Sequence, residues 1–165
     1  MYKTKRFKII LWLISILYAG IVIKLVLFKK PLEKYHEVNV YSIERNFRNA
    51  NFTPFHTIVI YLSGKPGFEH SFENIIGNII LFIPLTILIP LLIEKIQKAN
   101  QIILIGFLTS LAFEVIQLFG LRGNFDVDDL ILNTLGGIIG YVIFIQVKNL
   151  LPSANRYRRI RYPYK

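Results

Sequence analysis

Four long runs of apolar residues dominate the pattern of the chain. They cover residues 9–28, 75–93, 102–121 and 130–147, each 18 to 20 residues long and apolar on every helical face. A helix needs about 20 residues to cross a bilayer core of roughly 30 Å, so each run is long enough to span a membrane. A soluble protein of this size could not cover four such helices. The pattern therefore predicts an all-α, polytopic membrane protein with four transmembrane helices.

The first run follows a basic segment that contains Lys3, Lys5, Arg6 and Lys8. A cleaved signal peptide begins in the same way, but its apolar stretch is usually only ~7–15 residues long and ends at a small-residue cleavage site. No such site follows residue 28. We interpret the first run as a retained membrane anchor.

A polar segment, residues 29–74, separates the first two runs. Within it, residues 52–62 (FTPFHTIVIYL) form a short apolar run that contains Pro54 and precedes a Gly/Pro cluster at 64–67. Eleven residues are too few to cross a bilayer. We predict that this run is an interfacial or re-entrant segment.

The distribution of charge predicts an orientation. The chain has 20 Lys and Arg against 10 Asp and Glu, a formal net charge of +10. Twelve of the basic residues precede the first run, separate the second from the third, or lie in the tail 148–165, and seven lie in the other connections. The positive-inside rule then places both termini in the cytoplasm and residues 29–74 outside. The basic, Tyr-rich tail is interpreted as a segment held by anionic membrane lipids, with no nucleic-acid partner.

The composition also limits the chemistry. The chain has no cysteine, which removes disulfides, thiolate metal ligands and Cys nucleophiles. Its three histidines, His36, His56 and His70, are scattered along one connection. Zinc needs four closely placed ligands, so we expect no metal centre and no cofactor.

Polar side chains interrupt three of the apolar runs, each on one helical face. Glu114 lies inside the third run, where an ionisable group costs at least ~2.5 kcal/mol unless it is paired or faces water. Ser110 and Gln117 share its face. Under the predicted topology, the polar positions of all three runs collect near the outer face. The candidate ligand-binding residues are Asn74, Asn78, Glu114, Gln117, Arg122, Asp126, Asp129 and Asn133.

Structural roles are an alternative for several of these residues. Asp126 or Asp128 suits an N-terminal cap of the fourth helix, because a carboxylate there accepts from free N–H groups. The two glycines of G-x-x-x-G at 136–140 suit close helix packing. Glu114 and Arg122 suit an ion pair between the third helix and the loop that follows it. The sequence alone does not decide between these structural roles and ligand binding.

Four spaced motifs resemble the VanZ-like family of small bacterial membrane proteins. They are N-F-T-P-F at 51–55, E-N-I-I-G-N-I-I-L-F-I-P-L at 73–85, F-E-V-I-Q at 113–117 and R-G-N-F-D-V-D-D-L-I-L-N-T-L-G-G-I-I-G-Y at 122–141. The resemblance covers about residues 47–147. It implies a multi-pass protein of the bacterial plasma membrane. The member that gives the family its name lowers the susceptibility of bacteria to teicoplanin, a lipid-tailed glycopeptide, and the resemblance implies a related role.

The first functional hypothesis is binding without catalysis. An outward-facing polar pocket would bind or mask a lipid-linked cell-wall precursor or a lipoglycopeptide, with Arg122 donating to a phosphate or carboxylate. The pocket would be lined by Asn78, Glu114, Gln117, Arg122 and Asn133.

Two further hypotheses belong to other classes. In an enzyme acting on a lipid head group, Glu114 would be the general base. Asp126 and Asp129 would orient Arg122 or hold a hard cation such as Mg²⁺. In a small transporter, Glu114 would be a proton or cation site, although no ionisable residue continues the path inward from it.

Overall fold

The computed structural model describes residues 5–27, 40–65, 67–120 and 124–150. In this part of the chain every regular element is a helix, and the fold is all-α as predicted. The helices are α1 (Lys5–Leu27), α2 (Val40–Arg48), α3 (His56–Leu62), α4 (Phe68–Leu92), α5 (Ala99–Gly120) and α6 (Val127–Leu150).

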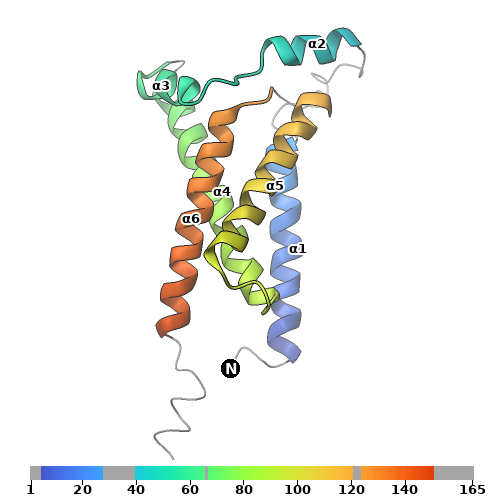
Figure 1. The fold of residues 1–165 in the computed structure, drawn as a ribbon, viewed down its shortest axis with the longest axis vertical. Coiled ribbons are helices and arrows are strands. Elements are labelled where there is room, and N and C mark those ends of the chain that lie inside the picture. Colours follow the sequence, from blue (N-terminus) through green and yellow to red (C-terminus); the bar gives the residue numbers. More distant parts are fainter. Residues whose placement is uncertain (1–4, 28–39, 66, 121–123, 151–165) are drawn as a thin grey trace, which may run out of the picture.

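Helices α1, α4, α5 and α6 form an elongated bundle (Figure 1). Each is long and apolar enough to cross a membrane, which confirms the prediction of four transmembrane helices. Each contains most or all of one predicted apolar run. The helices also continue into polar residues: α4 begins at Phe68, before the run 75–93, because backbone hydrogen bonding does not stop where hydropathy falls.

Polar contacts show which helix ends lie together. Lys8 near the start of α1 is 3.2 Å from Glu94 after α4. Lys148 near the end of α6 donates to Gln97 before α5, at 2.9 Å. The start of α1, the α4–α5 connection and the end of α6 therefore share one end of the bundle, and α2 and α3 lie at the other (Figure 1). The assignment of the first end to the cytoplasm remains the prediction from charge.

Helices α4 and α6 approach each other closely along a seam. A Cβ atom at Gly136 would collide with the backbone carbonyl of Ile79. One at Gly140 would collide with the carbonyl of Ile83 and the hydroxyl of Thr86. Small residues at these positions let the two backbones touch, as in membrane helix pairs generally. The seam agrees with the packing interpretation of the glycine motif.

Helix α1 is held differently. The Tyr18 hydroxyl donates to the carbonyl of Leu81 in α4 at 2.5 Å. Much of the remaining α1 surface is apolar and exposed, with Ile16 and Leu17 about two-thirds exposed at 64% and 67%. In a membrane such a surface faces lipid.

The two short helices cover the end of the bundle. In α2, Asn46 donates to the carbonyl of Leu118 in α5 at 2.9 Å, and the Phe47 ring packs edge-on against Phe119. Helix α3 lies within the predicted short run 52–62, and its Leu62 side chain is exposed. Its interfacial or re-entrant nature stays a prediction. Residues 28–39 of the first connection and 151–165 of the basic tail lie outside the described residues.

Candidate functional site

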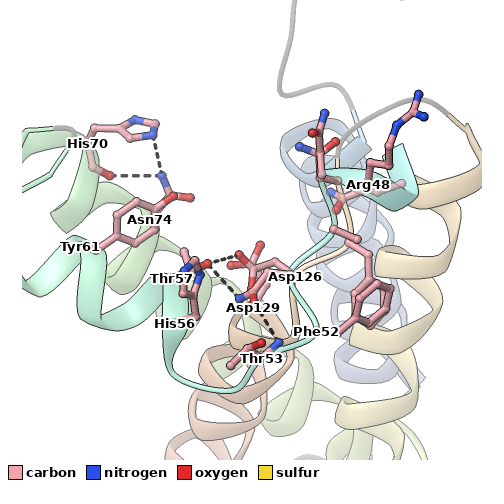
Figure 2. Close-up of a pocket in the computed structure, with 16 residues that line it drawn as sticks. Arg48, Phe52, Thr53, His56, Thr57, Tyr61, His70, Asn74, Asp126 and Asp129 are labelled. Atoms are coloured by element: carbon pink, nitrogen blue, oxygen red, sulfur yellow. Dashed lines mark hydrogen bonds between the residues drawn. The ribbon is translucent and has the colours of Figure 1, made fainter. Parts of the chain in front are cut away.

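A polar cavity of about 760 Å³ lies at the end of the bundle that carries α2 and α3. Its wall is formed by residues 48–53, α3, the first turns of α4, Gln117 of α5, residues 124–126 and the first turn of α6. Figure 2 shows Asp126 and Asp129 together in the middle of this lining, with His70 and Asn74 on one side and Arg48 on the other. The cavity thus gathers side chains that are up to 81 residues apart in the chain.

Asp128 lies behind the cavity wall and has no exposed surface. Its carboxylate accepts three backbone N–H groups, from Phe55 at 2.5 Å, Thr57 at 2.7 Å and Ile58 at 3.1 Å. These are the amides at the start of α3, which have no partner within their own helix. Charged acceptors make the stronger hydrogen bonds. Asp128 of α6 therefore caps α3, and of the two predicted candidates for the cap of α6, Asp126 or Asp128, only Asp126 takes that role.

The backbone at this cap is in a sparsely populated conformation. Phe55 has a φ of 66°, in the left-handed region that a bulky residue rarely adopts. Such a residue costs on the order of 1–3 kcal/mol and persists only where its surroundings fix it. The hydrogen bond from Phe55 to Asp128 supplies that constraint.

Asp126 caps α6 and joins it to the segment before α3. Its Oδ1 accepts from the backbone N–H of Asp128 at 2.9 Å, the expected geometry of an N-cap. Oδ1 also accepts from Asn51 Nδ2 at 2.8 Å, and Oδ2 accepts from the Thr57 hydroxyl at 2.7 Å. Asn51 and Asp126 also face each other in an isolated parallel bridge between the two backbone segments. The two loops are thereby tied together through main chain and side chains.

Glu114 lies beneath this network rather than in the cavity wall. Its side chain is 2% exposed, and its Oε2 accepts from the backbone N–H of Asp126 at 2.9 Å. Gln117, one turn further along α5, lines the cavity and donates to the carbonyl of Val26 in α1 at 2.9 Å. The predicted candidate base thus supports the loop before α6, while Gln117 links the cavity to α1.

The remaining amides of the predicted set, Asn74, Asn78 and Asn133, lie at three depths. Asn74 lines the cavity and donates to the carbonyl of His70 at 3.2 Å. Asn78 is buried one turn deeper and donates to Asp129 Oδ1 at 2.5 Å, joining α4 to α6. Asn133 is deeper still, away from the cavity wall, and donates to the hydroxyl of Ser110 at 2.8 Å. Arg122, the predicted anion ligand, lies outside the described residues.

The carboxylates also set the electrostatics of the lining. Burial first, and then the nearby charges of Asp129 and Asp126, raise the pKa of the Tyr61 phenol. The Tyr61 ring lies edge-on to the His70 imidazole, with ring centres 6.1 Å apart. Tyr61 therefore faces the cavity as a neutral hydrogen-bonding group. Among the described residues, no group of three or more His, Asp or Glu side chains is placed to hold a metal ion.

Sequence reasoning missed Asn51 and Thr57, and it did not foresee the partner of Asp128. Both missed residues flank Pro54, and the Asn51 side chain accepts from the backbone N–H of Thr53 at 3.0 Å, a local turn typical of asparagine. That turn could have been predicted from Asn51-Phe-Thr-Pro54. Its contact with Asp126 could not, because 75 residues separate the two.

Comparisons with known proteins identify relatives of this chain. A family model described as VanZ/LLP1 matches residues 15–150. The curated Protein VanZ of Enterococcus faecium is 31% identical over 128 residues, which cover 78% of this chain and 69% of that protein. No solved structure matches. The matched region contains α4, α5 and α6 whole and α1 from residue 15 onward.

Proposed function

Because the chain belongs to the VanZ/LLP1 family, we propose that it binds the polar head group of a lipid-anchored molecule of the bacterial cell envelope. It would act at the outer face of the plasma membrane and so lower susceptibility to lipoglycopeptides such as teicoplanin. The observation that carries the proposal is the polar cavity of about 760 Å³ at one end of an apolar bundle. Its volume lies within the usual range for ligand sites, about 300–1,000 Å³.

The lining suits a head group made of sugars or peptide. Such groups offer hydroxyl and amide donors and acceptors. Carboxylates accept hydrogen bonds from these donors, and side-chain amides and phenols both donate and accept. The described lining contains Asn74 and Tyr61 on one side, Asp129 in the middle and Arg48 on the other (Figure 2). A ligand anchored by its own lipid would reach the cavity without leaving the membrane surface, since the cavity lies at the ends of four spanning helices.

The position of the cavity fits an outward-facing site. It lies at the end of the bundle opposite Lys8 and Lys148. If the predicted orientation holds, with both termini in the cytoplasm, the cavity opens toward the side on which glycopeptides act on cell-wall precursors.

Binding has more support than catalysis in this arrangement. Both carboxylate oxygens of Asp126 accept hydrogen bonds from protein donors. Glu114 is almost completely buried and accepts a backbone N–H. A general base must reach the proton it abstracts, and these two carboxylates serve the architecture of the loops. The enzyme and transporter hypotheses have no comparable observation in their favour.

A blocking substitution tests the proposal. The full-length protein in lipid nanodiscs is titrated separately with teicoplanin and with purified lipid-linked cell-wall precursor. Asn74→Trp fills the cavity, and we expect it to weaken binding of the true ligand about tenfold or more, which corresponds to 1.4 kcal/mol. Asn149→Trp, an exposed position near the far end of α6, is the matched control.

The same two variants are compared in cells. Asn74→Trp should lose protection against teicoplanin and Asn149→Trp should keep it. Binding of only one ligand identifies which head group the cavity takes. The proposal is overturned if the wild type binds neither ligand, or if the two tryptophan variants bind equally well.

A further inference from the structure

A second hollow of about 240 Å³ lies between α1, α4 and α5, at the level of the membrane spans. Its wall includes three hydroxyl groups, yet it offers a ligand almost no polar surface, because each hydroxyl donates to a backbone carbonyl. The pairs are Ser15 with Leu11 at 2.8 Å, Tyr18 with Leu81 at 2.5 Å, and Thr109 with Ile105 at 2.8 Å. We call this hollow the apolar groove.

Water does not fill such a groove. A buried water needs two to four polar partners, and apolar cavities of this kind stay dry. At roughly 30 Å³ each, about the volume of one water molecule, the groove has room for about eight methylene groups. At the depth of the spans the surrounding medium is hydrocarbon. The occupant that fits both the volume and the surface is a hydrocarbon chain of about eight carbons.

The apolar groove and the polar cavity lie about one helical turn apart along one face of α5. Thr109 and Phe113 line the groove, and Gln117, the next position on the same stripe, lines the cavity. Four residues of helix advance about 6 Å. On α1, Val22 lines the groove, and Val26 accepts the hydrogen bond from Gln117. Helices α1 and α5 lie side by side here (Figure 1). The Gln117 hydrogen bond thus marks the boundary between a polar and an apolar compartment.

We propose that the apolar groove takes the hydrocarbon tail of the same molecule whose head group occupies the polar cavity. This inference rests on the proposed function. The ligand is then a single-tailed amphiphile, with its head group among the α3 and α6 side chains and its tail beside α1. The groove selects for tail length and shape rather than adding hydrophobic affinity, because the tail leaves one hydrocarbon environment for another.

Photochemical cross-linking locates the tail. The probe is teicoplanin whose acyl chain carries a diazirine near its end, added to the full-length protein in phosphatidylglycerol vesicles. Cross-linked residues are identified by mass spectrometry. We expect them at Val22, Leu85 and Phe113, on three different walls of the groove.

Two substitutions fill the groove and one matched substitution does not. Ala19→Phe and Ile23→Trp place a ring in it, and each should reduce these cross-links about fivefold or more by taking up the space. Ala112→Phe makes the same change at an exposed position of α5 that does not line the groove, and it should leave the cross-links unchanged. Binding of a glycopeptide without a tail, measured in parallel, reports on the cavity alone.

The outcomes separate this inference from the proposed function. Retained head-group binding, with cross-links spread equally over lipid-facing residues in every variant, overturns the groove and leaves the cavity standing. Cross-links that are equally strong in Ala112→Phe and both groove-filling variants do the same. Absence of head-group binding in the wild type overturns the proposed function and this inference with it.

Discussion

Helices α6 and α1 are attached to the rest of the bundle by contrasting means. Helix α6 touches α4 backbone to backbone at Gly136 and Gly140. The carboxylates of its N-cap Asp126 and of Asp128 in its first turn bind the loop before α3 and the start of α3. Helix α1 is attached through single side chains, of which Tyr18 is one. The first kind of contact fixes a position closely, because neither a backbone nor a buried carboxylate has room to move.

The difference separates a rigid part of the molecule from an adaptable one. The seam between α4 and α6 is the frame on which the polar cavity is built. The flank formed by α1 leaves a groove that its own side chains do not fill. If this contrast is correct, substitutions in the first region should cost much more stability than substitutions in the second.

The largest effect is expected at Asp128. Asp128→Ala leaves three backbone N–H groups without their acceptor, at about 1–3 kcal/mol for each buried group, so we expect a loss of about 4 kcal/mol. Thermal unfolding in detergent micelles, followed by circular dichroism, measures it. Glu69→Ala, an exposed acid of α4, is the control. Equal melting temperatures for the two variants would show that Asp128 does not anchor α3.

The glycine seam comes next. Gly136→Ala places a methyl group against the Ile79 carbonyl and should destabilise the protein by about 1–3 kcal/mol. Gly77→Ala, where an added Cβ meets nothing within 4 Å, should instead stabilise α4 by about 0.5–1 kcal/mol. The opposite signs of two chemically identical substitutions make this a direct test. A seam that tolerated both equally would not be close-packed.

The attachment of α1 should be weaker. Tyr18→Phe removes one hydrogen bond to Leu81 and should cost about 1 kcal/mol. The single tryptophan of the chain, Trp12, lies on α1 and reports its environment by fluorescence. We expect the Trp12 signal to change at a lower temperature than the circular dichroism signal in this variant. Coincident transitions in Tyr18→Phe and in the exposed control Tyr41→Phe would mean that α1 is as firmly held as α6.

The surface ion pair at the other end should matter least. Lys8 and Glu94 are 3.2 Å apart with more than half of each side chain exposed, 52% and 59%. Exposed pairs contribute about 0–1 kcal/mol and are screened by salt. Lys8→Ala should therefore lower stability by less than Tyr18→Phe does. At high ionic strength, Lys8→Ala and the wild type should be equally stable.

The pH dependence of Tyr61 sharpens the electrostatic side of the comparison. The pKa of Tyr61 is raised in the folded protein, so the folded state keeps its proton at a pH where the unfolded chain has lost it. The contribution to stability is then fully present below about pH 10 and is lost as the pH rises above it. Phenolate absorbance in the wild type and in Tyr61→Phe isolates this titration. Asp129→Asn should move it toward the ordinary value.

Hydropathy predicted the fold, because the length of an apolar helix is a local property. The four transmembrane helices and the all-α class are confirmed. The resemblance to the VanZ-like family, carried by short motifs, is confirmed as well. The ends of the helices were harder to predict from hydropathy. Helix α4 starts at Phe68, where backbone hydrogen bonding and not apolar character sets the end of the helix.

The site was harder to predict, because its contacts join distant segments. Periodicity together with the predicted topology placed Asn74, Gln117, Asp126 and Asp129 toward one end of the bundle, and all four line the cavity. Periodicity could not show that Glu114 accepts from a backbone amide of the next loop. The burial of Glu114 and its hydrogen-bond partner depend on the path of that loop, which has no repeating pattern of apolar residues. Whether any of these residues binds a ligand stays a prediction.

The carboxylate of Asp128 has a consequence for how the chain is made. It follows its three partners at the start of α3 by 70 to 73 residues. At about 5–20 residues per second, the ribosome delivers it roughly 4 to 15 s after them. During that interval the α3 amides have no acceptor from α6, and the wall that α3 contributes cannot be completed. The cavity end of the molecule is therefore assembled last, when the fourth span enters the membrane, and a chain arrested before residue 128 would have its first three spans but no cavity.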